Sequence, residues 1–151
     1  MAVSARNKAL LAGACRKRLC NVDGLGCGCS GRWLDAGGFL WVDDDYGMAP
    51  SFRREMARLF PDAQLVELPF SHPVFHQLYD FPAGLPKVHE HDGGPPMALG
   101  IVRDGRLCVL FSFDCDLGDG LEDEAVHKDP PEKREAAARM AINIVHYALT
   151  H

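Results

Sequence analysis

Apolar residues along the chain follow two spacings, one typical of buried strands and one typical of amphipathic helices. Residues 39–42 are a continuous apolar run that follows two glycines and ends in three aspartates, which predicts a strand buried on both faces. A helix of about two to three turns is predicted between Pro50 and Pro61, because proline is favoured in the first helical turn and is common just after the last one. Its predicted apolar face is Phe52, Met56, Leu59 and Phe60.

A second strand and a short helix are predicted next. Residues 64–68 are predicted to form the strand, and Ser71 is predicted to cap the helix, which has Pro73 in its first turn. The apolar face expected for this helix is Val74, Phe75 and Leu78.

The last third of the chain predicts a hairpin and a long helix. Residues 97–102 and 106–113 are apolar runs joined through Asp104-Gly105, a dipeptide suited to a turn that needs positive φ at both central residues. Residues 137–148 repeat apolar positions at the helical period. Two long loops, 80–96 and 114–130, precede these elements. Buried strands mixed with amphipathic helices predict an α/β fold, a three-layer sandwich with at least one antiparallel pair.

Composition and charge divide the chain into two unequal parts. Residues 1–36 carry six Lys and Arg against two Asp, whereas residues 37–151 carry ten against nineteen Asp and Glu, so the 151-residue chain has a net charge of -5. We therefore expect a basic, cysteine-rich segment over residues 1–30 and one folded domain over residues 31–151. The acidic balance argues against nucleic acid as a partner. No apolar run reaches the roughly 20 residues that span a bilayer, and we expect a cytoplasmic protein without a transmembrane segment.

The first candidate site is the aspartate run that ends the strand at residues 39–42. Ligands of open α/β sheets bind at the carboxyl ends of strands, where a following helix also offers amide donors. Asp44 and Asp45 are therefore candidate ligand-binding residues. The alternative is that these side chains cap a helix, face solvent or pair with nearby arginines.

The second candidate is a group of four histidines. His72 and His76 are four residues apart, a spacing that places two metal ligands on one face of a helix. His89 and His91 alternate in the loop 80–96 and could face a common ion. The alternative is that these histidines are hydrogen-bonded packing residues.

The third candidate is the acidic loop at residues 114–124. Its glycines do not fit the EF-hand register, which leaves either a solvated loop with Asp/Gly turns or an irregular cation site. Cys115 is a poor nucleophile candidate because it lacks the glycine-flanked turn and its carboxylate neighbours would raise its pKa.

These observations predict one shallow acidic cleft at the carboxyl edge of the strand that contains Trp41. The residues expected to line it are Asp44, Asp45, His72, His76 and Asp116. No cofactor is predicted, but a divalent metal is possible there. The candidate metal ligands are Asp44, His72, His76, His89 and His91.

Several motifs in their order along the chain resemble the bacterial domain of unknown function family 4159, from residue 31 to the end of the chain. They are residues 32–47, 51–56, 72–76, 116–118, 143–145 and 147–150. The resemblance implies a flavodoxin-like, class I glutamine amidotransferase-like sandwich. Residues 1–30 show no pattern for the first strand, helix and strand of that fold, either because another segment replaces them or because the start is read in a different frame.

In amidotransferases of that fold the catalytic cysteine occupies a turn after a strand, whereas Asp44 and Asp45 stand near the comparable place here. The resemblance therefore counts against glutaminase chemistry. Two functions remain open. The favoured one is a non-catalytic module that binds a small molecule or a protein; the alternative is a metal-assisted hydrolase or carbohydrate-modifying enzyme that uses the aspartate and histidine cluster.

Overall fold

The computed structural model describes residue 34 and residues 36–44, 47–89 and 93–151. Its centre is a four-stranded mixed sheet in the order β1-β4-β3-β2. The strands are β1 (Leu40–Asp43), β2 (Val66–Glu67), β3 (Met97–Arg103) and β4 (Arg106–Phe113). The α/β prediction and the antiparallel pair are thereby confirmed, since β3 pairs antiparallel with β4 and β1 pairs parallel with β4.

The hairpin of β3 and β4 forms as its turn residues predict. Asp104 and Gly105 have φ of 50° and 78°, so both central positions are left-handed. Pairing runs from Met97 opposite Phe113 to Ile101 opposite Val109, and then shifts so that Val102 lies opposite Leu107. Cys108 is therefore an extra residue in β4, as in a β-bulge.

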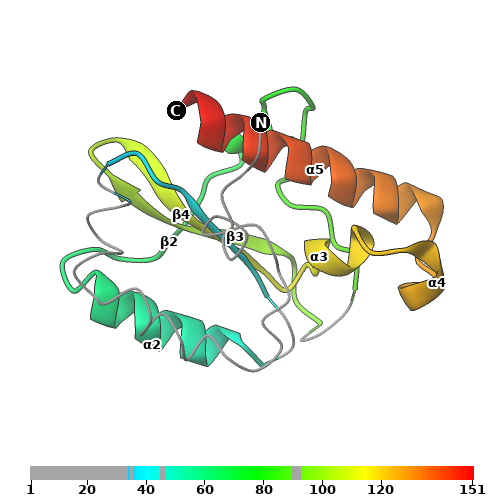
Figure 1. Cartoon of the computed structure of the whole chain (residues 1–151), viewed down its shortest axis with the longest axis horizontal. Helices are drawn as coiled ribbons and strands as arrows, with labels where there is room; N and C mark the ends of the chain where they lie inside the picture. The colour runs from blue at the N-terminus through cyan, green and yellow to red at the C-terminus, as the bar shows by residue number, and fades with distance from the viewer. Residues whose placement is uncertain (1–33, 35, 45–46, 90–92) are drawn as a thin grey trace.

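The helix α2 (Ala49–Leu59) covers one face of the sheet (Figure 1). Phe52 and Met56 are buried, and the ring of Phe52 stacks on Phe111 of β4 at 4.1 Å between centroids. Burial of such a side chain contributes about 1.5–3 kcal/mol to folding. The predicted apolar face of this helix is thus confirmed in place, although Leu59 is only partly buried.

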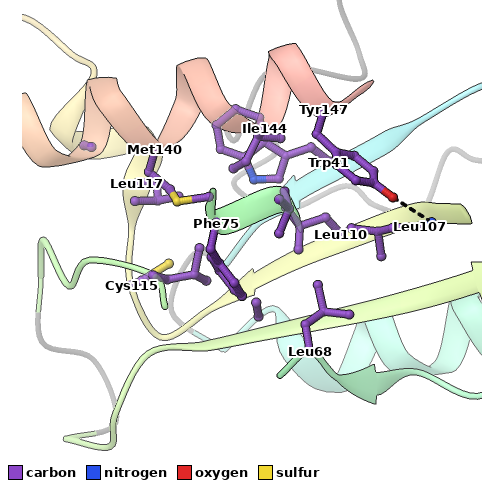
Figure 2. Close-up of a cluster of buried hydrophobic side chains, with 14 of the residues drawn as sticks. Trp41, Leu68, Phe75, Leu107, Leu110, Cys115, Leu117, Met140, Ile144 and Tyr147 are labelled. Atoms are coloured by element: carbon purple, nitrogen blue, oxygen red, sulfur yellow. Dashed lines mark hydrogen bonds between the residues drawn. The ribbon is translucent and has the colours of Figure 1, made fainter. Parts of the chain in front are cut away.

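The helix α5 (Pro131–Thr150) covers the opposite face (Figure 1). Figure 2 shows Met140, Ile144 and Tyr147 of this helix above Leu110 and Trp41 of the sheet. The Tyr147 hydroxyl accepts a hydrogen bond from the backbone N–H of Leu107 at 3.2 Å, which ties the end of α5 to the start of β4.

The segment after β2 differs from its prediction. The strand covers two residues rather than five, and the short helix is the single 3₁₀ turn η3 (Pro73–Phe75). Its cap is His72 rather than Ser71, because the His72 Nδ1 accepts the N–H of Val74 at 3.2 Å. Leu78 is 61% exposed and does not belong to the core.

Asn143 of α5 holds the chain that follows η3. Its Oδ1 accepts the N–H groups of Leu78 and Tyr79, both at 3.0 Å, and its Nδ2 donates to the Tyr79 carbonyl at 2.7 Å. Because Asn143 is fully buried and satisfied in this way, it fixes the loop against the helix.

The acidic segment 114–130 is not one loop, as predicted, but contains two short helices. These are α3 (Leu117–Gly120) and α4 (Glu124–His127). Asp123 caps α4 by accepting the Ala125 N–H at 2.9 Å. Asp114 and Asp116 both adopt positive φ, so the backbone turns sharply between β4 and α3. The basic segment predicted for residues 1–30 lies outside the described residues.

Candidate functional site

The carboxyl ends of β1 and β4 meet at one edge of the sheet because the two strands are parallel. Asp43 lies opposite Ser112 there. Its carboxylate accepts hydrogen bonds from the Ser112 hydroxyl and from the Gly118 N–H of α3, the latter at 2.6 Å. The indole N–H of Trp41 donates to the same Ser112 oxygen at 3.0 Å. The candidate edge is therefore held by a buried polar network.

Burial raises the pKa of Asp43 to about 7, although hydrogen bonds from Ser112 and Gly118 act in the opposite direction. Burial also raises the pKa of the neighbouring Cys115 thiol well above its usual value, and the negative charge of Asp43 adds to that shift. Cys115 is 0% exposed. As the sequence indicates, this thiol is protonated and shielded, which makes it a poor nucleophile.

A second polar group joins the loop 80–96 to the end of β4. Asp44 is buried, and its Oδ2 accepts the Asp114 N–H at 3.4 Å. The Asp114 carboxylate in turn accepts the Gly94 N–H at 3.1 Å and contacts the Lys87 ammonium at 3.1 Å. Lys87 also donates to the Gly94 carbonyl. These contacts bring the loop over the carboxyl edge.

His89 lies where the loop 80–96 meets the acidic segment. Its Nε2 is 2.8 Å from Oδ1 of Asp129, and its Nδ1 is 3.3 Å from Oδ2 of both Asp116 and Asp119. Partial burial lowers the pKa of His89, but the hydrogen bond and charge of Asp129, with the charges of Asp116 and Asp119, give a net upward shift.

His127, the last residue of α4, faces the same carboxylate from the other side. Its Nδ1 is 3.5 Å from Oδ2 of Asp119, and its Nε2 is 2.9 Å from Oε2 of Glu122. The rings of His89 and His127 are 5.2 Å apart between centroids. His89, Asp119 and His127 each place one ligand atom within 4.8 Å of the others. This arrangement can hold a metal ion.

Of the predicted site residues, Asp44, Asp116 and His89 come to the carboxyl edge or the acidic segment beside it. Asp45 and His91 lie outside the described residues.

His72 is at the other end of the sheet. Its ring packs on that of Tyr147 at 5.6 Å between centroids, and the Tyr147 hydroxyl accepts a hydrogen bond from the Leu107 N–H at the start of β4. Ser112 is five positions after Leu107, which is about 16 Å along a strand. Burial lowers the pKa of His72, and the nearby His151 lowers it further. The structure therefore does not bring His72 to Asp44.

His76 does not join the edge either. Its Nε2 is 2.8 Å from the Phe70 carbonyl oxygen and its Nδ1 is 2.5 Å from Oδ1 of Asp80, which together raise its pKa. The expectation that His72 and His76 share one face required an α-helix. Because η3 ends at Phe75, the two side chains go to separate partners.

Asp119, His127 and Asp129 were not among the predicted metal ligands. The acidic loop drew attention to Asp119 only as part of an irregular cation site, and no spacing rule links His127 to His89. The one sequence signal for this site is that His127 follows closely after the acidic residues 114–124. A shallow hollow lies beside these residues and is lined by Asp123, Glu124, Ala125 and Lys128.

Comparison with known proteins places the chain in a family. Within the described residues, no helix combines the length and apolar character needed to cross a membrane. No curated protein matches the chain. Residues 31–149 match the family model described as Domain of unknown function (DUF4159), and because this match covers most of the chain, the protein belongs to that family.

Proposed function

We propose that the domain is a non-catalytic module that binds a ligand at the carboxyl edge of β1 and β4. The observation that carries this proposal is the convergence of two long segments on that edge, since His89 of one contacts Asp116, Asp119 and Asp129 of the other. Loops positioned by a rigid sheet are where binding residues collect. The ligand is a small molecule or a protein rather than a nucleic acid, in keeping with the net charge of -5.

The buried thiol supports the non-catalytic assignment. Cys115 is the cysteine nearest this edge among the described residues, and its burial and raised pKa keep it from acting as the nucleophile of a glutaminase. The Asp43 carboxylate accepts hydrogen bonds from both Ser112 and Gly118, as a member of a structural network does.

Two observations favour a second function, a metal-assisted hydrolase or carbohydrate-modifying enzyme. Two histidines and a carboxylate surround one point, as they do in hydrolytic metal sites, and Asp43 has a pKa near that of an efficient general acid or base.

A substrate panel separates the two functions. Wild-type protein and a His127→Ala variant are incubated with chromogenic esters, phosphate esters and glycosides, with and without Zn²⁺, Mn²⁺ or Ca²⁺. The module predicts the same background rate for both proteins. Turnover by the wild type that disappears in His127→Ala would instead establish the hydrolase.

Amide NMR tests where a ligand binds. Sugars, nucleotides, amino acids and dicarboxylates are titrated into labelled, metal-free protein, and the module predicts that a binding compound shifts the signals of residues 87–89 and 116–119. Shifts confined to η3 and the far end of α5 would overturn the proposed edge.

We also propose the flavodoxin-like, three-layer sandwich for the family fold and the cytoplasm as the compartment. The location of α2 and α5 on opposite faces of the sheet supports the first. Cys108, a buried thiol that is not part of a disulfide, is compatible with the second. An experimental structure and cell fractionation test them.

A further inference from the structure

The Nδ1 atoms of His89 and His127 both face one carboxylate oxygen, Oδ2 of Asp119. We propose that His89, His127 and Asp119 bind one divalent transition-metal ion of the Zn²⁺ type, with a fourth coordination position left for water or a ligand. This site does not depend on whether the domain is a binding module or an enzyme.

The distances from the Asp119 carboxylate to the two histidine nitrogens fit a tetrahedral ion, and all three ligand atoms lie within 4.8 Å of one another. Bonds of about 2.0–2.2 Å from Zn²⁺ to nitrogen and oxygen place neighbouring ligand atoms about 3.3–3.5 Å apart. The Asp119 Oδ2 is 3.3 Å from the His89 Nδ1 and 3.5 Å from the His127 Nδ1. Both separations exceed the roughly 2.7–2.9 Å of a charge-assisted hydrogen bond, so direct pairing accounts for them less well than a shared ion does.

The Nε2 atom of each ring lies at hydrogen-bond distance from a carboxylate, as is usual for histidines that bind a metal through the other nitrogen. The Nε2 of His89 is 2.8 Å from Asp129, and the Nε2 of His127 is 2.9 Å from Glu122. When Nε2–H donates to a carboxylate, the lone pair of Nδ1 faces the opposite side of the ring, which is the arrangement found around bound zinc. Here both lone pairs face Asp119.

The negative charges of the buried Asp129 and Asp116 side chains also favour binding of a cation. The side chain of Asp129 is 7% exposed, and within the described structure its Oδ2 has no hydrogen-bond partner. Asp116 adds a further carboxylate at 3.3 Å from the His89 Nδ1. A buried carboxylate oxygen without a donor is costly, and an ion bound beside His89 would offset part of that cost.

The ligand types select the class of metal. Ca²⁺ and Mg²⁺ take oxygen ligands, whereas imidazole suits Zn²⁺ and other first-row divalent ions. Two imidazoles with one carboxylate therefore favour Zn²⁺, or Co²⁺ as its spectroscopic substitute, over Ca²⁺. The three ligands come from the loop before β3, from α3 and from α4, so the ion would join segments that are separate in the chain (Figure 1).

Metal titration tests the site directly. Chelator-treated full-length protein is titrated with Zn²⁺ by calorimetry and with Co²⁺ by absorption spectroscopy. We expect one imidazole- and carboxylate-bound Co²⁺ with the intense visible bands of a tetrahedral ion. His89→Ala and His127→Gln should each weaken Zn²⁺ binding by about 100-fold or more, and Asp129→Asn, which alters only the orienting carboxylate, by about 10- to 100-fold.

His76→Ala is the matched control, because His76 also pairs with a carboxylate, that of Asp80, but is not one of the three residues of the cluster. It should bind Zn²⁺ as the wild type does. Circular dichroism of each metal-free variant shows whether it folds, and a Zn²⁺-dependent rise in Tm should be seen in the wild type and His76→Ala only.

Two results would overturn the proposal. One is equal Zn²⁺ affinity in the wild type and in a folded His127→Gln variant. The other is a thiolate charge-transfer band of bound Co²⁺ that persists in that variant, which would place the ion on cysteines such as Cys27 and Cys29. Neither result bears on the proposed ligand edge, because NMR titration of that edge is done on metal-free protein.

Discussion

Asp43 shows what the sequence can and cannot predict for a single residue. The three aspartates after a buried strand correctly indicate a polar edge of the sheet. They do not indicate which of the three carboxylates is buried. The burial of Asp43 depends on Ser112 and Gly118, which are about 70 residues away in the chain and meet it only when β1 pairs with β4. Local pattern carries no information on such a contact.

The raised pKa of Asp43 predicts a pH-dependent contribution to stability. The carboxyl has a pKa of about 7 in the folded protein and 3.8 as its ordinary value, so between those limits the folded state binds more protons than the unfolded state. Its favourable contribution is complete below about pH 4 and is lost as pH rises through about 7. Asp43→Asn, which remains neutral, should therefore gain stability relative to the wild type between about pH 5 and about pH 8.

Urea unfolding of the wild type and Asp43→Asn at about pH 5 and about pH 8 measures this difference in stability. Asp62→Asn, at an exposed position, serves as the control and should follow the wild type. If Asp43→Asn changes in parallel with the wild type across the range, Asp43 is ionised in the fold and its inferred protonation is wrong.

Elements were predicted well where their signals are local. The hairpin follows from Asp104-Gly105, and α2 from its flanking prolines and apolar spacing. The helices α3 and α4 were missed because each has only four residues and too few apolar positions to show a period. The helix α3 packs on α5, which is a contact of the folded chain, and α4 is capped locally by Asp123.

The close approach of α3 to α5 depends on Gly120. A Cβ at this position would lie 2.7 Å from the Ala137 Cβ and 3.1 Å from the Val88 Cγ2. Gly120→Ala should therefore destabilise the protein by about 1–3 kcal/mol, because the helix backbones must move apart.

Chemical denaturation of a double-mutant cycle checks the cause. Adding Ala137→Gly removes the opposing methyl group, so the two changes together should cost less than the sum of the single changes. Strict additivity would show that the loss arises elsewhere than at this contact.

At the scale of the molecule, the sequence predicted the α/β class, whereas the strand order came from the structure. The central strand β4 could be recognised as buried, but its pairing with β1 on one side and β3 on the other depends on long-range packing. Separate clusters under α2 and α5 confirm that both faces of the sheet are covered by apolar contacts.

This arrangement predicts a gradient of local stability across the sheet. Leu107 through Phe111 in β4 are 0% exposed and lie between two strands, whereas Val66 and Glu67 of β2 are exposed and pair on one described side only. Amide hydrogen exchange followed by mass spectrometry should be slowest in β4 and fast in β2. Equal protection of the two strands would contradict this order.

The hydrogen bonds from Trp41 through Ser112 to Asp43 and Gly118 also connect an optical probe with the edge. The indole is embedded in the core under α5, while Gly118 immediately precedes the proposed ligand Asp119. Because indole emission is sensitive to its hydrogen bonds and to nearby charge, this chain of contacts makes Trp41 an intrinsic fluorophore for events at α3. Trp41 is one of two tryptophans in the chain, so in a Trp33→Phe variant we expect its emission to follow occupancy of the edge without an attached dye.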